Sequence, residues 1–370
     1  MLRHRISPHR LEDGMGTDMA TIDEEQVAEL LGRFVNDLGA TISAGNVLIG
    51  DKLGLYQTLA EAGPLTPSEL GAYTSTAERY VREWLPGQAA GGYISYDAET
   101  GRYSMTKAQA LAFADPAGLV LPGAFQLAVA CLSDESMILD AFRTGGGVAW
   151  GEHDPDVFTG TERFFRPGYV ANLVSSWIPA VGGLRERLVA GIPVADVGCG
   201  LGASTRILAD TYPASSVRGF DPHLESIELA RKAAAEADLA DRCDFAVARA
   251  QDFPGSGYGL VATFDCLHDM GDPIGAARHI RAALSADGVW LIVEPYAGAS
   301  VAENLTPVGR IYYSFSTFLC VPHAISEGAG NALGNQAGEA AIGDVVEAAG
   351  FRTFRRVAET PFNLVYEARP

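Results

Sequence analysis

The sequence has few cysteines and no long apolar run. Its five cysteines are scattered, without a CxxC pair or metal-ligand spacing, and their odd number suits a reducing compartment better than a disulfide framework. The most apolar window, residues 118–132, is broken by Pro122, Gly123 and Gln126, so we expect no membrane span. The basic first ten residues are not followed by an apolar stretch, which argues against a signal or transit peptide. We therefore expect a cytoplasmic protein with a disordered tail at residues 1–20.

Positive charge is also scarce. The chain has 27 lysines and arginines against 46 aspartates and glutamates, which gives a net charge of −19 at pH 7. Because phosphate backbones and anionic membranes attract clustered Lys and Arg, this balance argues against nucleic acid or a membrane as the main partner. The 370 residues, 48% of them hydrophobic, are enough for a full core and for two domains.

The first part of the chain has the pattern of a winged helix. Apolar residues recur at helical spacing over residues 24–62, with an interruption at Gly39, and residues 66–69 and 75–88 predict two further helices. Residues 93–96 and 102–106 alternate as two short strands would. Three helical segments followed by a hairpin predict a winged-helix-like domain over residues 21–115.

Charge bears on the role of this domain. Residues 20–115 contain six Lys or Arg and thirteen Asp or Glu, whereas a DNA-reading domain should be basic. We interpret the domain as a dimerisation and substrate-wall module, and a DNA- or protein-binding role stays open as the alternative. Residues 116–183 are helical, interrupted by glycines and dense in aromatic residues, so we expect a connector that lines a pocket.

Strands and helices alternate from residue 194 onward. The predicted strands cover residues 194–197, 217–220, 243–248, 260–264 and 289–293, separated by helix-length crossovers, which is typical of a doubly wound parallel sheet. Residues 351–357 and 362–368 are joined by only four residues, so the sheet should close with an antiparallel hairpin. The fold class is therefore α/β, with a Rossmann-like, mostly parallel sheet in a domain over residues 184–370. Residues 296–337 form an insertion that we expect to act as a substrate lid.

A glycine-rich loop follows the first of these strands. The segment reads Asp196-x-Gly198-x-Gly200-x-Gly202, and a helix begins near Ser204. Glycines let the backbone approach a ligand closely, and the helix start offers free N–H groups. The loop loosely fits a dinucleotide fingerprint, but an acid two residues before the first glycine, the mid-chain position and the terminal hairpin favour S-adenosylmethionine over NAD.

On these residues the stretch 184–369 resembles the class I S-adenosylmethionine-dependent methyltransferases. This cofactor has a cationic ammonium and sulfonium and no pyrophosphate, so carboxylates near the loop are physically reasonable. The resemblance implies that Asp196 and the three glycines hold the methionine end and that Asp221 binds the ribose hydroxyls. It further implies that Asp252 and Phe253 contact the adenine and that Asp265 belongs to the cofactor site.

The segment Leu267-His268-Asp269-Met270 follows the fourth strand of the predicted sheet. It resembles the Leu-His-Asp-Trp segment of small-molecule O-methyltransferases, with Met270 in place of the tryptophan. The resemblance implies that His268 is a general base and that Asp269 and Glu294 orient it, since neutral imidazole accepts a proton near pH 7. The alternative is a rim histidine that only shapes the pocket.

The acceptor side is less defined. Aromatic residues in the connector and the insertion either face an aromatic acceptor or pack in the core, and Arg166 either anchors an acceptor carboxylate or forms a surface salt bridge. The whole layout resembles actinobacterial small-molecule methyltransferases and, by analogy, predicts a homodimer. We expect methyl transfer to a small aromatic metabolite, at oxygen; N- or C-methylation, or a winged-helix transcriptional regulator with the cofactor as effector, are the alternatives. The candidate substrate-binding residues are Phe165, Arg166, Tyr169, Tyr312, Tyr313 and Phe318.

Overall fold

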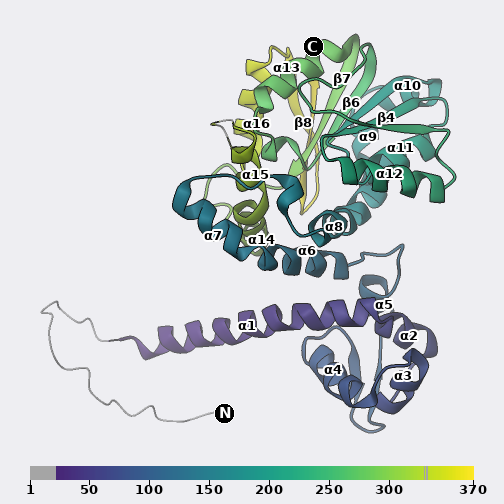
Figure 1. The fold of residues 1–370 in the computed structure, drawn as a ribbon, viewed down its shortest axis with the longest axis vertical. Helices are drawn as coiled ribbons and strands as arrows, with labels where there is room; N and C mark the ends of the chain where they lie inside the picture. Colours follow the sequence, from purple (N-terminus) through teal and green to yellow (C-terminus); the bar gives the residue numbers. More distant parts are fainter. Residues whose placement is uncertain (1–21, 329, 331) are drawn as a thin grey trace, which may run out of the picture. The chain divides into compact units, whose positions relative to one another are not determined.

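The computed structural model describes residues 22–328, 330 and 332–370 (Figure 1). The chain divides into two compact units, residues 1–43 and 44–370. The tail predicted at residues 1–20 lies outside the described residues. Within them, no helix has both the length and the apolar character needed to cross a bilayer.

The winged-helix prediction is confirmed in element order. The first helix runs without a break through Gly39, because a single glycine costs a long helix only about 1 kcal/mol. Thr66 and Glu69 form a capping box at the start of the third helix, and Arg102 from the hairpin binds the same glutamate at 2.8 Å. The elements are α1 (Glu24–Lys52), α2 (Leu55–Ala62), α3 (Pro67–Thr74), α4 (Glu78–Ala90), β1 (Ser95–Asp97), β2 (Arg102–Ser104) and α5 (Lys107–Phe113).

The connector is helical, as predicted. Helices α6 and α8 pack closely, because Gly160 has no side chain: a Cβ there would lie 2.6 Å from the backbone nitrogen of Leu127. Arg163 on α8 binds Asp51 on α1 at 2.8 Å. The elements are α6 (Pro122–Ser133), α7 (Glu135–Thr144), η1 (Trp150–Glu152), α8 (Asp156–Asn172), the π-helix η2 (Leu173–Trp177), α9 (Ile178–Ala180) and α10 (Leu184–Ala190).

The predicted α/β fold is confirmed. Seven strands form one sheet in the order β5-β4-β3-β6-β7-β9-β8, in which β9 runs antiparallel to both of its neighbours and the other pairs are parallel. The strands are β3 (Pro193–Val197), β4 (Ser216–Asp221), β5 (Cys243–Val247), β6 (Tyr258–Phe264), β7 (Leu284–Pro295), β8 (Thr353–Glu359) and β9 (Asn363–Arg369).

Helices cover both faces of the sheet (Figure 1). One apolar core joins the sheet to α10, α11 (Ala203–Thr211) and α12 (Leu224–Glu236), and a second joins it to α13 (Pro273–Ala283) and α16 (Gly338–Ala348). The predicted insertion folds as α14 (Pro307–Phe315), the π-helix η4 (Ser316–Cys320) and α15 (Val321–Ser326). The chain reverses direction of winding between β3 and β6, and ligands bind at such switch points, beyond the carboxyl ends of the strands.

Candidate functional site

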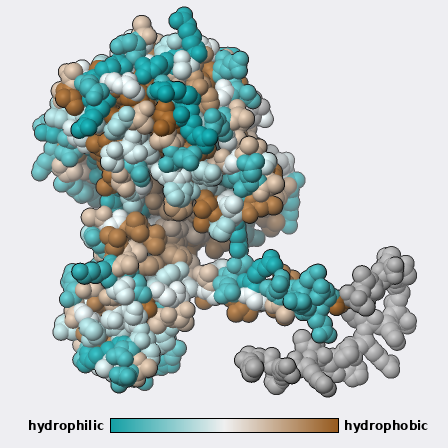
Figure 2. Space-filling view, turned by 180° about the vertical axis from the view of Figure 1, so that it is seen from behind, coloured by the Kyte–Doolittle hydropathy of each residue, from teal (hydrophilic) through white to brown (hydrophobic). Residues whose placement is uncertain are grey.

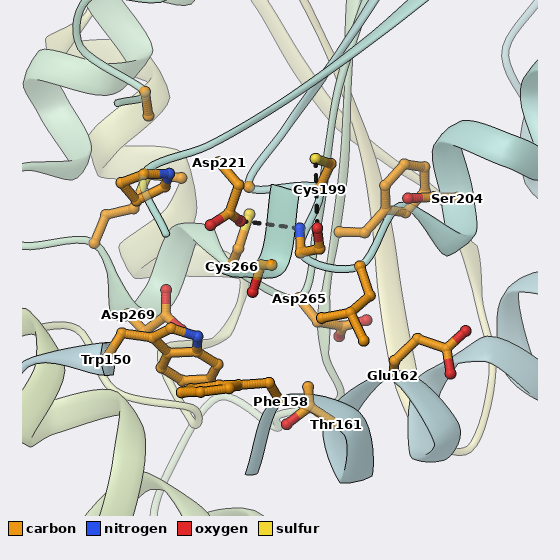
Figure 3. Close-up of a pocket in the computed structure, with 18 of the residues that line it drawn as sticks. Trp150, Phe158, Thr161, Glu162, Cys199, Ser204, Asp221, Asp265, Cys266 and Asp269 are labelled. Atoms are coloured by element: carbon orange, nitrogen blue, oxygen red, sulfur yellow. Dashed lines mark hydrogen bonds between the residues drawn. The ribbon is translucent and has the colours of Figure 1, made fainter. Parts of the chain in front are cut away.

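A cavity lies at this switch point (Figure 3). It encloses about 1100 Å³, its open mouth included. Its walls come from the glycine loop, the ends of β4, β5 and β6, helix α8, the η1 segment and helix α15. The residues that line it include Trp150, Phe158, Thr161, Glu162, Phe165, Tyr169, Gly198, Gly200, Leu201, Ser204, Asp221, Arg249, Ala250, Gln251, Asp265, Cys266, Asp269, Met270, His323 and Glu327.

The glycine loop is held against the end of β4. Gly198 has φ +74°, and a Cβ there would lie 2.6 Å from Sγ of Cys266, so only glycine fits without strain. The Gly200 N–H donates to Oδ2 of Asp221 at 2.9 Å, and the His223 N–H donates to Oδ1 at 2.9 Å. Asp221 therefore ties two loops together at the cavity wall.

Asp196, which the sequence analysis expects at the methionine end of the cofactor, lies behind the glycine loop. Its side chain is buried, and Oδ2 accepts hydrogen bonds from the hydroxyls of Ser204 and Thr205, both at 2.6 Å. Burial raises its pKa to about 6, against the lowering effect of those hydroxyls. Its Oδ1 has no hydrogen-bond partner among the described residues, and the side chain is not part of the cavity wall. Asp196 thus supports the start of α11 from behind the loop, as does Gly202 at the helix N-cap.

The cavity wall is rich in carboxylates. Among its described residues are five acids and one arginine, Arg249. Burial, with a smaller effect of the Glu294 charge, raises the pKa of Asp265 to about 8, although Tyr169 and Asn363 both donate to it at 2.8 Å. Burial also raises the pKa of Asp269 to about 7. Carboxylates so perturbed are stabilised in their charged form by a nearby cation, so the cavity favours a cationic ligand.

The residues predicted to contact an adenine ring are not brought to the wall. Phe253 is 1% exposed and packs in the core, with its ring 5.2 Å from that of Phe220 and 4.6 Å from that of His279. Asp252 is exposed, and its carboxylate accepts the N–H of Arg249. The wall is formed instead by the three residues just before them, 249–251.

His268 and Glu294 are brought together. Nδ1 of His268 lies 2.7 Å from Oε2 of Glu294, while Oε1 accepts the N–H of Leu267 at 3.0 Å, and both side chains are almost fully buried. Burial lowers the pKa of His268, but the charges and hydrogen bonds of Glu294 and Cys320 together outweigh this effect, and the pKa lies well above its ordinary value. The thiol of Cys320 on η4 is the other hydrogen-bond partner of the imidazole. His268 therefore lies directly behind the wall formed by its neighbours in the same loop.

The predicted acceptor-binding residues separate into two groups. Phe165 and Tyr169 line the cavity and stack on each other at 6.2 Å. The other four do not line it: Tyr312 is buried with its hydroxyl on the carbonyl of Phe362, Phe318 packs in an apolar cluster, Tyr313 lines a separate cavity, and Arg166 pairs with Glu162 at 3.3 Å.

Several wall residues have no local signal in the sequence. Trp150, Phe158, His323 and Glu327 come from segments about 40 to 125 residues away from the glycine loop. In Figure 3, Trp150 and Phe158 lie across the cavity from Asp221 and Cys199. The aromatic density of residues 116–183 and the predicted substrate lid at residues 296–337 pointed toward this wall, but not toward these particular residues.

Two domain models match the chain, and they agree with this architecture. An Rv2258c-like winged HTH domain matches residues 41–114, and a methyltransferase domain matches residues 195–290. No curated protein sequence matches the chain.

Solved structures share the fold over most of the chain. Mitomycin 7-O-methyltransferase is 17% identical with a TM-score of 0.68, and 94% of this chain and 100% of that chain are covered. Human N-acetylserotonin methyltransferase, in complex with S-adenosylmethionine, is 18% identical with a TM-score of 0.67, covering 95% and 99%. An O-methyltransferase from neocarzinostatin biosynthesis, in complex with S-adenosylmethionine and 2-hydroxy-5-methyl naphthoic acid, is 18% identical with a TM-score of 0.59, covering 88% and 95%. At these identities the likeness shows a shared fold.

Proposed function

Because the chain is a class I S-adenosylmethionine-dependent methyltransferase with an N-terminal winged-helix domain, we propose that it methylates a hydroxyl group of a small aromatic metabolite, with His268 as general base. The observation that carries this proposal is the 2.7 Å contact between His268 and Glu294 beside the cofactor cavity. When bound, S-adenosylmethionine supplies an electrophilic methyl group on a sulfonium.

The cavity residues fit this cofactor. Its ammonium and sulfonium are cations, and the wall offers an excess of buried carboxylates whose charged forms a cation would stabilise. Asp221 would hold the ribose hydroxyls, and Gly198, Gly200 and Asp265 would hold the methionine end. Asp196 would act through the loop that it fixes.

His268 has the chemistry that oxygen acceptors require. A hydroxyl is a weak nucleophile until its proton is removed, and a histidine oriented by a carboxylate is suited to remove it. Glu294 fixes the ring through Nδ1, which leaves the other nitrogen for the acceptor. That nitrogen faces the Cys320 thiol, so the acceptor hydroxyl would take the place of the thiol. Nitrogen and carbon acceptors, the alternatives, need this base less or in a different way.

The aromatic wall supports an aromatic acceptor. Trp150, Phe158, Phe165 and Tyr169 line the same cavity as the glycine loop. Flat rings of this kind bind apolar ring systems and leave orientation to a few polar groups.

Product analysis tests the proposal. The protein is incubated with S-[methyl-¹³C]adenosylmethionine and a panel of phenols and naphthols, and the products are examined by mass spectrometry and NMR. We expect the label in an aryl methyl ether. Label on carbon or nitrogen would overturn oxygen as the acceptor atom, and transfer to no member of the panel would overturn the acceptor class.

The match of residues 41–114 to a winged HTH domain keeps a regulatory role as the second candidate. The acidic balance of this region works against DNA binding, because like charges repel. Sequence-specific retention of DNA in a gel-shift assay at moderate salt would favour the regulator. We also propose a cytoplasmic location, in keeping with five cysteines that are all free.

Cofactor binding is expected to release protons near pH 7. Asp265, with its pKa near 8, is mostly protonated in the free protein, and a bound cation would lower that pKa. The buffer takes up the released protons, and phosphate and Tris do so with different enthalpies. Calorimetric titration with S-adenosylmethionine should therefore give different binding enthalpies in the two buffers, and the difference should correspond to the release of up to about one proton. Asp265→Asn should reduce the difference. Equal enthalpies in the two buffers for the unaltered protein would contradict the carboxylate assignment.

We further propose a homodimer through α1. Six of its apolar residues are each at least 41% exposed and repeat every three, four or seven positions, which places them on one face: Val27, Leu31, Phe34, Leu38, Ile42 and Ile49. Apolar side chains are visible along this helix in Figure 2. Ala44 and Val47, two of the buried residues of α1, lie on the other side of the helix. This stripe spans about 33 Å of helix, long enough to pair with the same helix of a second copy.

Negative charges introduced on this apolar stripe should dissociate the proposed dimer. Leu31→Glu with Leu38→Glu would place carboxylates in an apolar interface, so we expect the dimer dissociation constant to rise by about 100-fold or more in sedimentation equilibrium. Glu29→Gln with Arg33→Gln is the matched control, because these two residues pair on the opposite face. An unaltered monomer, or equal effects of the two double variants, would contradict the interface.

A further inference from the structure

The wall that carries Trp150 also holds one imidazole whose hydrogen bonding is incomplete. His323 on α15 lines the cavity, and its ring lies edge to face against the indole of Trp150, with centroids 5.8 Å apart. Its Nδ1 is buried and has no hydrogen-bond partner among the described residues. A buried nitrogen without a partner costs free energy, so the site is complete only when something else supplies one.

The groups around His323 keep it neutral. Burial lowers its pKa, His153 lowers it further, and Glu327 one turn along the chain raises it less than these two lower it. A neutral imidazole exchanges a hydrogen bond with a hydroxyl or a carbonyl at a smaller desolvation cost than a charged group would. His323 therefore differs from His268, whose partners Glu294 and Cys320 occupy both sides of the ring.

His153 is a second histidine near Trp150 with which His323 can be compared. It lies on the other side of Trp150, with ring centroids 6.3 Å apart, and Asp134 binds its Nδ1 at 2.8 Å. Its Nε2 also has no partner, but the side chain is fully buried and is not part of the cavity wall. Of these two histidines, only His323 can meet a ligand in the cavity.

We propose that His323 is a positioning residue for the acceptor: its Nδ1 hydrogen-bonds a second oxygen substituent on the aromatic ring whose other hydroxyl is methylated. This inference rests on the proposed O-methylation. It assigns the acceptor to the dioxygenated arenes, since the ring of Trp150 packs against His323 and that of Phe158 against Trp150, with the Glu327 carboxylate as the other polar group beside His323. The two histidines then hold two points of one ring system, which fixes the hydroxyl that reacts.

Dihydroxynaphthalenes and 1-naphthol test this assignment. For the unaltered protein, KM for the preferred dihydroxynaphthalene isomer should be about 10-fold lower than KM for 1-naphthol, because the additional hydrogen bond to His323 corresponds to about 10-fold in affinity. In His323→Leu this preference should disappear, because the KM for the dihydroxynaphthalene should rise to the KM that the same variant shows for 1-naphthol. His323→Asn, which keeps a polar atom near the position of Nδ1, should restore part of the preference.

A binding measurement without turnover accompanies the kinetics. The dissociation constant of the same isomer is measured by calorimetry on protein saturated with S-adenosylhomocysteine, and His323→Leu should raise it about 10-fold. The control is Ser326→Ala, an exposed residue at the end of the same helix, which should change nothing. Thermal unfolding checks that each variant is folded.

The outcomes separate this inference from the proposed function. Methylation of 1-naphthol with an unchanged dihydroxynaphthalene preference in His323→Leu, or with no preference in the unaltered protein, would overturn the role of His323 alone. Failure of the unaltered protein to methylate any naphthol would overturn the proposed acceptor class, whatever the variants bind.

Discussion

Replacing His268 with glutamine is expected to lower kcat for a hydroxyl acceptor by about 10²- to 10⁴-fold, the usual contribution of a general base. Glutamine still donates a hydrogen bond to Glu294 but cannot take a proton, so the variant removes the base with less disturbance than alanine. His268→Ala would leave the Glu294 carboxylate buried without its partner, at a cost of about 3–5 kcal/mol. The cofactor dissociation constant should change less than about 3-fold, because the His268 side chain is not part of the cavity wall.

The pH dependence tests the same base. A base acts in its unprotonated form, and the pKa of His268 lies above its ordinary value of 6.5, so kcat should still rise with pH above 6.5. Glu294→Gln removes the charge that raises this pKa and leaves the burial that lowers it. The rise should then shift to lower pH, by about 1–3 units, while the plateau rate falls. Unchanged turnover in His268→Gln, or a rise that does not move in Glu294→Gln, would remove His268 as base.

Replacing Asp221 with alanine is expected to weaken binding of S-adenosylhomocysteine by about 100-fold, measured by calorimetry. The substitution removes the acceptor of two backbone N–H groups, those of Gly200 and His223, and hydrogen bonds to a charged group contribute about 1.5–3 kcal/mol each. It also removes the carboxylate proposed to hold the ribose.

Asp252→Ala is the matched control for Asp221→Ala. Both aspartates were predicted from the sequence as cofactor contacts, but only Asp221 lines the cavity, whereas Asp252 is exposed. We expect a change of less than about 3-fold for Asp252→Ala. Equal losses in both variants would contradict the assignment of Asp221, and not Asp252, to the cofactor site.

Much of the fold could be predicted because its signals are local. The helix start at Thr66, the strand before Gly198 and the short turn before the last strand each depend on a few neighbouring residues, and each is present, although the turn has three residues where four were predicted. The winged helix and the methyltransferase domain inferred from the sequence are confirmed by the two domain models, and solved methyltransferases share the fold.

The placement of side chains at or away from the cavity depends on side-chain direction and long-range packing. The sequence places Phe253 near the end of a strand, but only tertiary packing directs its ring into the core beside Phe220 rather than into the cavity. Trp150 and His323 reach the cavity from an irregular segment and an insertion, where no periodic pattern predicts a position. Tyr312, in contrast, was predicted to bind the acceptor but lies away from the cavity, because its hydroxyl donates to a backbone carbonyl in the core.

The central claim is that His268, held by Glu294, removes the proton of an aromatic hydroxyl next to the cofactor. The most direct test is a crystal structure with S-adenosylhomocysteine and a naphthol that the protein methylates. The account predicts the naphthol oxygen within about 3 Å of the second nitrogen of His268, with Cys320 displaced from it. A naphthol oxygen bound away from His268, with the imidazole still against the Cys320 thiol, would contradict it.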